Sequence, residues 1–156
     1  MKVTLQQKQT REFFDGFSKG WSRNAKSNYN DFVNIVKIRN MYCESQAKKY
    51  LKKNGKILDV GCGSGDLVVS LLQKKYDCFG LDFAKGMITK AKNHAKKLNF
   101  DSNRFTLSSF FDFNSKEKFD MVSANGVIEY ISTDELDQFI KKAGKILKKD
   151  GINLLI

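Results

Sequence analysis

The chain has 156 residues, 41% of them hydrophobic, which suits a single domain built around one core. No apolar run approaches the ~20 residues of a membrane span, and the amino-terminus lacks the apolar segment of a signal peptide. We therefore expect a cytoplasmic protein without a transmembrane segment. The three cysteines have no C-x-x-C spacing and there is one histidine, which argues against a disulfide framework or a metal site.

The net charge of +11 is concentrated in the amino-terminal third of the chain. Residues 1–58 carry a net charge of +9, and the remaining 98 residues carry +2. One interpretation is a set of solvated, lysine-rich helix faces; the other is contact with an acidic acceptor, anionic lipid or nucleic acid. The first is favoured because the lysines are scattered and form no tight run.

Two helices are expected in this amino-terminal third. The first spans residues 4–19 and ends at Gly20; its apolar positions are Leu5, Phe13, Phe14 and Phe17. Residues 21–30 are polar and turn-like. The second helix is expected over residues 31–53, where apolar residues recur at helical spacing, and the Asn54-Gly55 pair ends it.

The rest of the chain is organised around residues 57–67, Ile-Leu-Asp-Val-Gly-Cys-Gly-Ser-Gly-Asp-Leu. The short apolar run predicts a buried strand, three glycines follow, and an apolar helical stretch begins at Leu67. This order is typical of a nucleotide-binding βα unit, although a plain tight turn has the same pattern.

The glycine spacing and one carboxylate narrow the choice of ligand. The spacing is G-x-G-x-G, whereas a dinucleotide fingerprint reads G-x-G-x-x-G. Asp59 lies two residues before the first glycine, where a carboxylate would repel a pyrophosphate and suit a positive amino group. These features argue against a nicotinamide oxidoreductase, which is the rival interpretation.

Further strands are expected over residues 76–81, 104–107, 119–123 and 152–156. Asp82 closes the second strand, and a helix follows over residues 84–98. Ser132-Thr133-Asp134-Glu135 is a capping box that starts another helix.

Residues 55–156 resemble the class I S-adenosylmethionine-dependent methyltransferases. The matching segments occur in the family's order: Asp59–Gly65, Gly80-Leu81-Asp82, Phe119–Val122, Val127–Ile131 and Leu147–Gly151, the last similar to the family's "LKPGG" turn before the fifth strand. The resemblance implies a Rossmann-like α/β three-layer sandwich with a parallel sheet of strand order 3-2-1-4-5. Residues 1–54 would then form a helical lid, and residues 55–156 the core that binds S-adenosyl-L-methionine.

The resemblance also implies roles for individual residues. Asp59 would hold the methionine amino group, Asp82 the ribose hydroxyls, and Arg39 the cofactor carboxylate. The other implied cofactor contacts are Gly61, Cys62, Gly63, Phe83, Met87, Ser109, Phe110, Asn125, Trp21 and Tyr29. Ser109 stands near the place where the family usually has an Asp for the adenine amino group. Simpler roles stay open: packing for Trp21 and Tyr29, a helix cap for Asp82, and a surface position for Arg39.

The acceptor and the catalytic residues are less determined by the sequence. Tyr130 or Glu129 is a candidate general base, with structural packing as the alternative. The chain contains no proline, which removes the N/D-P-P-Y and Pro-Cys motifs of two nucleic-acid-modifying classes, so a small-molecule O- or N-acceptor is expected. A tRNA or protein acceptor, and a non-catalytic cofactor-binding or subunit-interaction module, remain alternatives. The family adds two strands after the fifth, so we expect the exposed edge to be covered by a missing carboxy-terminal segment or by a second subunit.

Overall fold

The computed structural model describes the backbone of residues 5–24 and 31–156 and the side chains of residues 6–18 and 35–156. Five parallel strands form one sheet in the order β3-β2-β1-β4-β5. The strands are β1 (Lys56–Val60), β2 (Asp77–Asp82), β3 (Phe105–Leu107), β4 (Phe119–Ala124) and β5 (Leu147–Leu155). The predicted α/β class and strand order are therefore confirmed.

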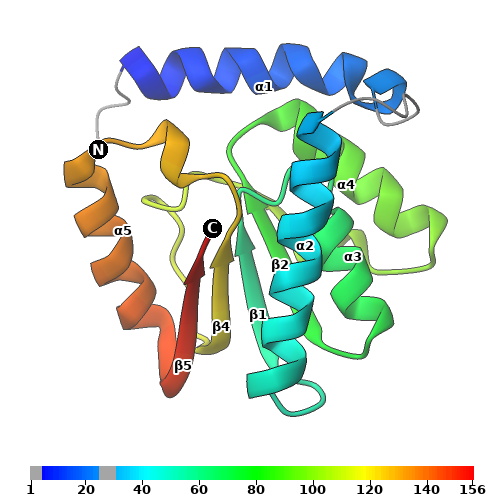
Figure 1. Cartoon of the computed structure of the whole chain (residues 1–156). Coiled ribbons are helices and arrows are strands. Elements are labelled where there is room, and N and C mark those ends of the chain that lie inside the picture. The colour runs from blue at the N-terminus through cyan, green and yellow to red at the C-terminus, as the bar shows by residue number, and fades with distance from the viewer. Residues whose placement is uncertain (1–4, 25–30) are drawn as a thin grey trace.

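Helices cover both faces of the sheet and its carboxyl edge (Figure 1). The helices are α1 (Leu5–Asn24), α2 (Asp31–Tyr50), α3 (Asp66–Gln73), α4 (Lys85–Lys97) and α5 (Thr133–Ile146), with short 3-10 turns η1 (Ser102–Arg104) and η2 (Ile128–Tyr130). No helix in the described part of the chain is long and apolar enough to cross a membrane.

Two apolar clusters, one on each face, explain why consecutive residues in the middle of β1 are apolar. Ile57 of β1 packs with α2, α3 and α4 residues, whereas the next residue, Leu58, packs with Phe139 and other α5 residues on the opposite face. A parallel strand covered on both faces has no solvated side. Asp59 is the one buried polar residue of β1 and is 3% exposed, so a buried carboxylate lies near the end of the central strand.

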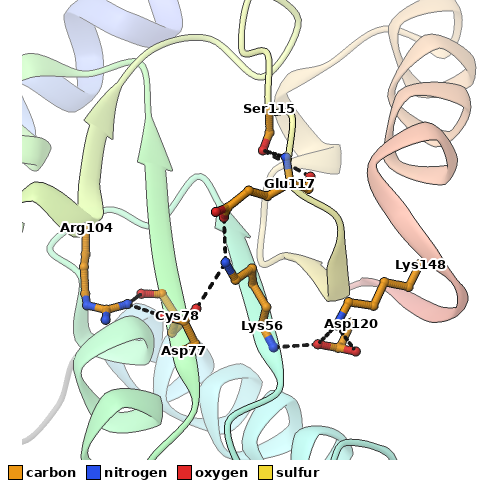
Figure 2. Close-up of polar contacts among 8 residues, drawn as sticks. All are labelled: Lys56, Asp77, Cys78, Arg104, Ser115, Glu117, Asp120 and Lys148. Atoms are coloured by element: carbon orange, nitrogen blue, oxygen red, sulfur yellow. Dashed lines mark hydrogen bonds and ion pairs between the residues drawn. The ribbon is translucent and has the colours of Figure 1, made fainter.

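A polar network joins the amino-terminal ends of the strands, at the edge opposite the cavity described below (Figure 2). Lys56 Nζ lies 2.6 Å from a Glu117 carboxylate oxygen and 3.3 Å from Asp77. Its backbone N–H donates to Asp120, which also pairs with Lys148 at 2.8 Å. The network fixes the starts of β1, β2, β4 and β5 relative to one another.

Three predicted boundaries differ from the structure by three residues or more. The first helix continues through Gly20 to Asn24, because a glycine inside a helix costs only about 1 kcal/mol relative to alanine. The second helix ends at Tyr50, three residues earlier than predicted. The predicted turn over 147–151 lies within β5 as a strand irregularity, since Leu147 pairs with Phe119 and Ile152 already pairs with Met121.

Candidate active site

A cavity of about 210 Å³ lies at the carboxyl ends of the strands, below α1. Its wall contains every predicted site residue whose side chain the structure describes: Arg39, Asp59, Gly61, Cys62, Gly63, Asp82, Phe83, Met87, Ser109, Phe110, Asn125, Glu129 and Tyr130. Trp21 is in α1, but its side chain lies outside the described residues, as does all of Tyr29. Residues from four strand ends and from α2 thus share one hollow, as expected for ligand binding in an open α/β sheet.

The glycine loop after β1 requires its glycines for two different reasons. Gly61 has a φ of +71°, and a Cβ there would lie 2.5 Å from Val127 Cγ2. Gly63 also has a positive φ, +52°, but a Cβ there would meet nothing within 4 Å. Because Gly63 lines the cavity, that open space is the cavity itself, and a side chain would occupy room needed by a ligand.

Cys62 lies inside this loop and packs against the sheet. A Cβ added at Gly80 would lie 2.8 Å from its Sγ. Burial, followed by the charge of Asp82, raises the pKa of the Cys62 thiol well above its usual value. A neutral, buried thiol suits packing of the loop and does not suit nucleophilic chemistry.

Asp59 supplies a buried carboxylate at the centre of the cavity wall. Ser123 Oγ donates a hydrogen bond of 2.8 Å to its Oδ1. Burial raises the pKa of Asp59 to about 7; the Ser123 hydrogen bond opposes this rise, and the charge of Asp82 adds to it. Such a group favours a cationic ligand, because an ammonium would compensate the charge that burial penalises.

Asp82 connects the second strand to the glycine loop. Its Oδ2 accepts from Gly63 N at 2.9 Å, and its Oδ1 accepts from Ala84 N at 2.8 Å. Ala84 is the N-cap residue of α4, so the alternative prediction of Asp82 as the helix cap is wrong by two positions. Each carboxylate oxygen can therefore accept a second hydrogen bond, from a ligand. Burial raises the pKa of Asp82, although the hydrogen bonds from backbone N–H groups oppose this rise.

Arg39 of α2 enters the cavity beside the end of β4. Its Nη2 lies 2.6 Å from Glu129 Oε1, so the two predicted site residues form an ion pair across the cavity wall. The nearby Asn125 amide donates to Asn40 Oδ1 at 3.2 Å and accepts from Cys43 Sγ at 3.2 Å. Asn125 is therefore held by α2 and fixes this helix to the carboxyl end of β4.

Ser109 and Phe110 follow β3 on the far side of the cavity. Ser109 Oγ accepts from Phe111 N at 3.0 Å, which shapes the turn, and Phe110 packs on Phe139 of α5 with ring centroids 4.4 Å apart. Asp112 also lines the cavity and is exposed. This turn thus presents a serine and an aspartate where the family usually has a single aspartate.

Sequence reasoning missed the inward face of α1, which lines the cavity with Gln7, Thr10, Arg11 and Phe14. The Arg11 guanidinium lies over the Phe83 ring at 5.6 Å, and the Phe14 ring meets Tyr130 edge-on with centroids 5.2 Å apart. The only signal was the one-turn spacing of positions 7, 11 and 14, but two of these side chains are polar and did not mark an inward face.

Polar contacts hold the middle of α1 and its amino-terminal turn over the cavity. Asp15 accepts a 2.7 Å hydrogen bond from Gly86 N at the start of α4. The positive end of the α4 dipole also stabilises a carboxylate at this position. In the amino-terminal turn, Gln7 Nε2 donates to Glu135 of the α5 capping box. Figure 1 shows α1 crossing the carboxyl edge between these two helices.

The family model described as a methyltransferase domain matches residues 51–156. The chain belongs to the methyltransferase domain family. The resemblance to class I S-adenosylmethionine-dependent methyltransferases is therefore confirmed, and the glycine loop and Asp82 lie within the matched residues.

Individual relatives extend the similarity towards the amino-terminus. The ubiquinone biosynthesis O-methyltransferase of Pelagibacter ubique is 31% identical over 159 residues, covering 96% of this chain and 63% of that protein. The ribosomal RNA small subunit methyltransferase C of Buchnera aphidicola subsp. Schizaphis graminum is 38% identical over 108 residues, covering 64% of this chain and 31% of that protein. The chain thus spans less than two thirds of either relative.

A solved structure shares the fold over most of the chain. Magnesium protoporphyrin IX methyltransferase from Synechocystis PCC 6803, crystallised with bound S-adenosylmethionine, has a TM-score of 0.72 and 20% identity, covering 95% of this chain and 75% of that one. At this identity, the likeness shows a shared methyltransferase fold.

Proposed function

We propose that the chain binds S-adenosyl-L-methionine in this cavity and transfers its methyl group to an oxygen or nitrogen atom of a small molecule. The observation that carries the proposal is the buried Asp59 carboxylate beside the glycine loop. S-adenosylmethionine offers an ammonium group for Asp59 and has no phosphate for it to repel.

The cavity has a suitable group for each part of the cofactor. Asp59 binds the amino group and Arg39 binds the carboxylate, with charge-assisted hydrogen bonds in both cases. Gly63 lets the ligand approach the loop closely. Asp82 accepts from the ribose hydroxyls, and the adenine lies near Phe83; Met87, Ser109 and Phe110 complete that part of the wall.

The acceptor side of the cavity favours an apolar or aromatic small molecule. Phe14, Phe111, Tyr130 and Ile131 line this part of the wall. The acceptor lone pair forms a bond to the methyl carbon while the carbon–sulfur bond breaks and its electrons return to sulfur. The sulfonium is already activated, so the protein contributes mainly proximity and alignment. The acceptor must also lose its proton. The Tyr130 hydroxyl can receive this proton while passing its own to solvent, because it is both a donor and an acceptor, whereas the Glu129 carboxylate is engaged with Arg39.

Calorimetric titration of S-adenosylhomocysteine into the purified chain tests the cofactor site. We expect binding by the wild type and at least about tenfold weaker binding by Asp82→Ala, since a charged hydrogen bond to the ribose contributes ~1.5–3 kcal/mol. Asp150→Ala is the matched control, because Asp150 is an exposed acid in β5. Absence of binding by the folded wild type would contradict the proposal.

Turnover separates an enzyme from a non-catalytic cofactor-binding module. We expect the chain to produce S-adenosylhomocysteine from S-adenosylmethionine in the presence of phenolic or amine acceptors, and Tyr130→Phe to lower kcat while cofactor affinity is kept. Cofactor binding without turnover across phenols, amines and a tRNA sample would favour the module.

A further inference from the structure

Apolar side chains cover both faces of α2, although only one face is buried. Cys43 and Ala47 on the inner face are fully buried. On the outer face, Ile38 is 65% exposed and Met41 is 60% exposed. The outer group consists of Ile35, Ile38, Met41 and Tyr42, called the α2 patch below. A surface helix ordinarily keeps its large apolar side chains on the face that packs on the core, so the α2 patch requires a separate explanation.

The α2 patch is unusual within this molecule as well. Nine large apolar side chains are exposed among the described residues, and the patch accounts for four of them within eight consecutive positions. In Figure 1, α2 lies at the front of the molecule, and no other described element covers its outward side. Clustered exposed apolar residues of this kind mark interaction surfaces, whereas single exposed ones are ordinary.

Lysines lie within the α2 patch and on its carboxy-terminal side, and residues 35–53 contain no unpaired acid. Exposed lysines lie at positions 37, 48, 49, 52 and 53. The one acid between residues 35 and 53 is Glu44, which is half-buried and pairs with Lys74 at 3.0 Å. The surface therefore combines apolar side chains with positive charge, which is the composition of helices that lie in the plane of an anionic membrane surface.

We propose that the outer face of α2 docks on an anionic phospholipid bilayer. The apolar side chains of the α2 patch enter the boundary between headgroups and acyl chains, and the five lysines contact lipid phosphates. A second copy is disfavoured, because a symmetric contact through this face would bring the lysines of both copies together.

Docking through this face would place the cavity close to the lipid. Val36, Arg39 and Asn40 on the inner side of α2 line the cavity, and a helix with its side chains is only about 10 Å thick. An apolar acceptor dissolved in the bilayer would therefore lie about one helix diameter from the cavity. The docking proposal itself does not depend on the proposed methyl transfer.

Co-sedimentation with vesicles tests the proposal directly. We expect binding to phosphatidylcholine vesicles containing about one third phosphatidylglycerol, and little binding to phosphatidylcholine alone, since each surface lysine contributes about fivefold to partitioning on anionic lipid. Ile38→Gln/Met41→Gln should reduce partitioning at least about tenfold. Glutamine is a good helix former, so circular dichroism should be unchanged.

Two matched controls distinguish binding through the α2 patch from nonspecific hydrophobic adsorption and from an effect of net charge alone. Ile140→Gln/Leu98→Gln removes two exposed apolar side chains elsewhere and should leave vesicle binding unchanged. Lys37→Glu/Lys48→Glu should abolish binding, whereas Lys145→Glu/Lys149→Glu, with the same change in net charge, should retain most of it.

Three results would overturn the proposal: no binding of the wild type to anionic vesicles, equal losses in patch and control variants, or a wild-type dimer that Ile38→Gln/Met41→Gln dissociates. The last result would assign the face to a second copy. Calorimetry with S-adenosylhomocysteine on the same variants keeps this test distinct from that of methyl transfer, because cofactor affinity should not change in the patch variants.

Discussion

Cofactor affinity should depend on pH through the ionisation of Asp59. Burial raises the pKa of this carboxyl to about 7, against the hydrogen bond from Ser123 and with the charge of Asp82. Only the ionised form attracts an ammonium group. The ligand must therefore displace the proton that Asp59 carries below neutral pH, and affinity should rise as pH increases towards 7.

The magnitude follows from the ionised fraction. With a pKa of about 7, roughly 1% of Asp59 is ionised at pH 5 and about half at pH 7, so the Kd of S-adenosylhomocysteine should fall about fiftyfold over this range. The amino group of the ligand is protonated throughout this window. At about pH 6, binding should release close to one proton, which calorimetry in two buffers of different ionisation enthalpy measures directly.

Two substitutions isolate the group responsible. Asp59→Asn should bind weakly with a nearly flat pH profile. Ser123→Ala removes the hydroxyl that donates to Asp59 Oδ1, so the midpoint should move to higher pH. Asp150→Asn is the control and should reproduce the wild-type profile. A wild-type Kd that does not vary between pH 5 and 7, or a profile unchanged in Asp59→Asn, would refute the reasoning.

Three other outcomes are expected. Gly63→Ala should abolish cofactor binding, because the added Cβ occupies the cavity. Its free energy of unfolding in urea should fall by only about 1–2 kcal/mol, because the Cβ meets no protein atom within 4 Å and the main penalty is the φ of +52°. Retained binding would contradict this prediction. Glu129→Gln should tighten S-adenosylhomocysteine binding two- to fivefold, because the ion pair of Arg39 with Glu129 at 2.6 Å is worth ~0.2–1 kcal/mol and competes with the ligand for Arg39. Arg39→Gln should instead weaken binding about tenfold. Equal effects of the two changes would argue against Arg39 as the group that binds the cofactor carboxylate. Burial alone would raise the pKa of Asp120, but hydrogen bonds from Lys148 and from the Lys56 backbone outweigh it and lower the pKa. Asp120→Asn should therefore lower the free energy of unfolding by roughly 1 kcal/mol at pH 7. This difference between variant and wild type should vanish as the pH falls below the folded-state pKa of Asp120.

The segments that the sequence predicted correctly are those whose physical determinants are local. The apolar run of β1, the glycine loop and Asp82 at the end of β2 each depend on neighbours within a few residues. The strand order 3-2-1-4-5 was instead predicted from the resemblance to the methyltransferase family. The Ser132–Glu135 capping box was predicted from four consecutive residues and is present in the structure.

What could not be predicted depends on partners distant in sequence. Asp15 accepts from Gly86 N at the start of α4, 71 positions away, and nothing near Asp15 indicates this contact. Arg11 faces the cavity although polar residues at helical spacing usually face solvent. The ion pair of Arg39 with Glu129 likewise joins elements 90 positions apart. Such contacts are decided by how α1 and α2 dock on the sheet, which local patterns do not determine.

The buried acids of the cavity also tie function to stability. Because the folded-state pKa of Asp59 lies above its unfolded value of 3.8, the folded protein holds a proton that the unfolded chain releases, and this group lowers stability as pH rises from about 4 to 7. Asp59→Asn should therefore be more stable than the wild type at neutral pH and equal to it at about pH 4, although its site is impaired. A ligand ammonium would restore the lost stability by pairing with the carboxylate, so S-adenosylhomocysteine should raise the melting temperature of the wild type more than that of Asp59→Asn. Stability is thus sacrificed at the residue that gives the cavity its preference for a cationic ligand.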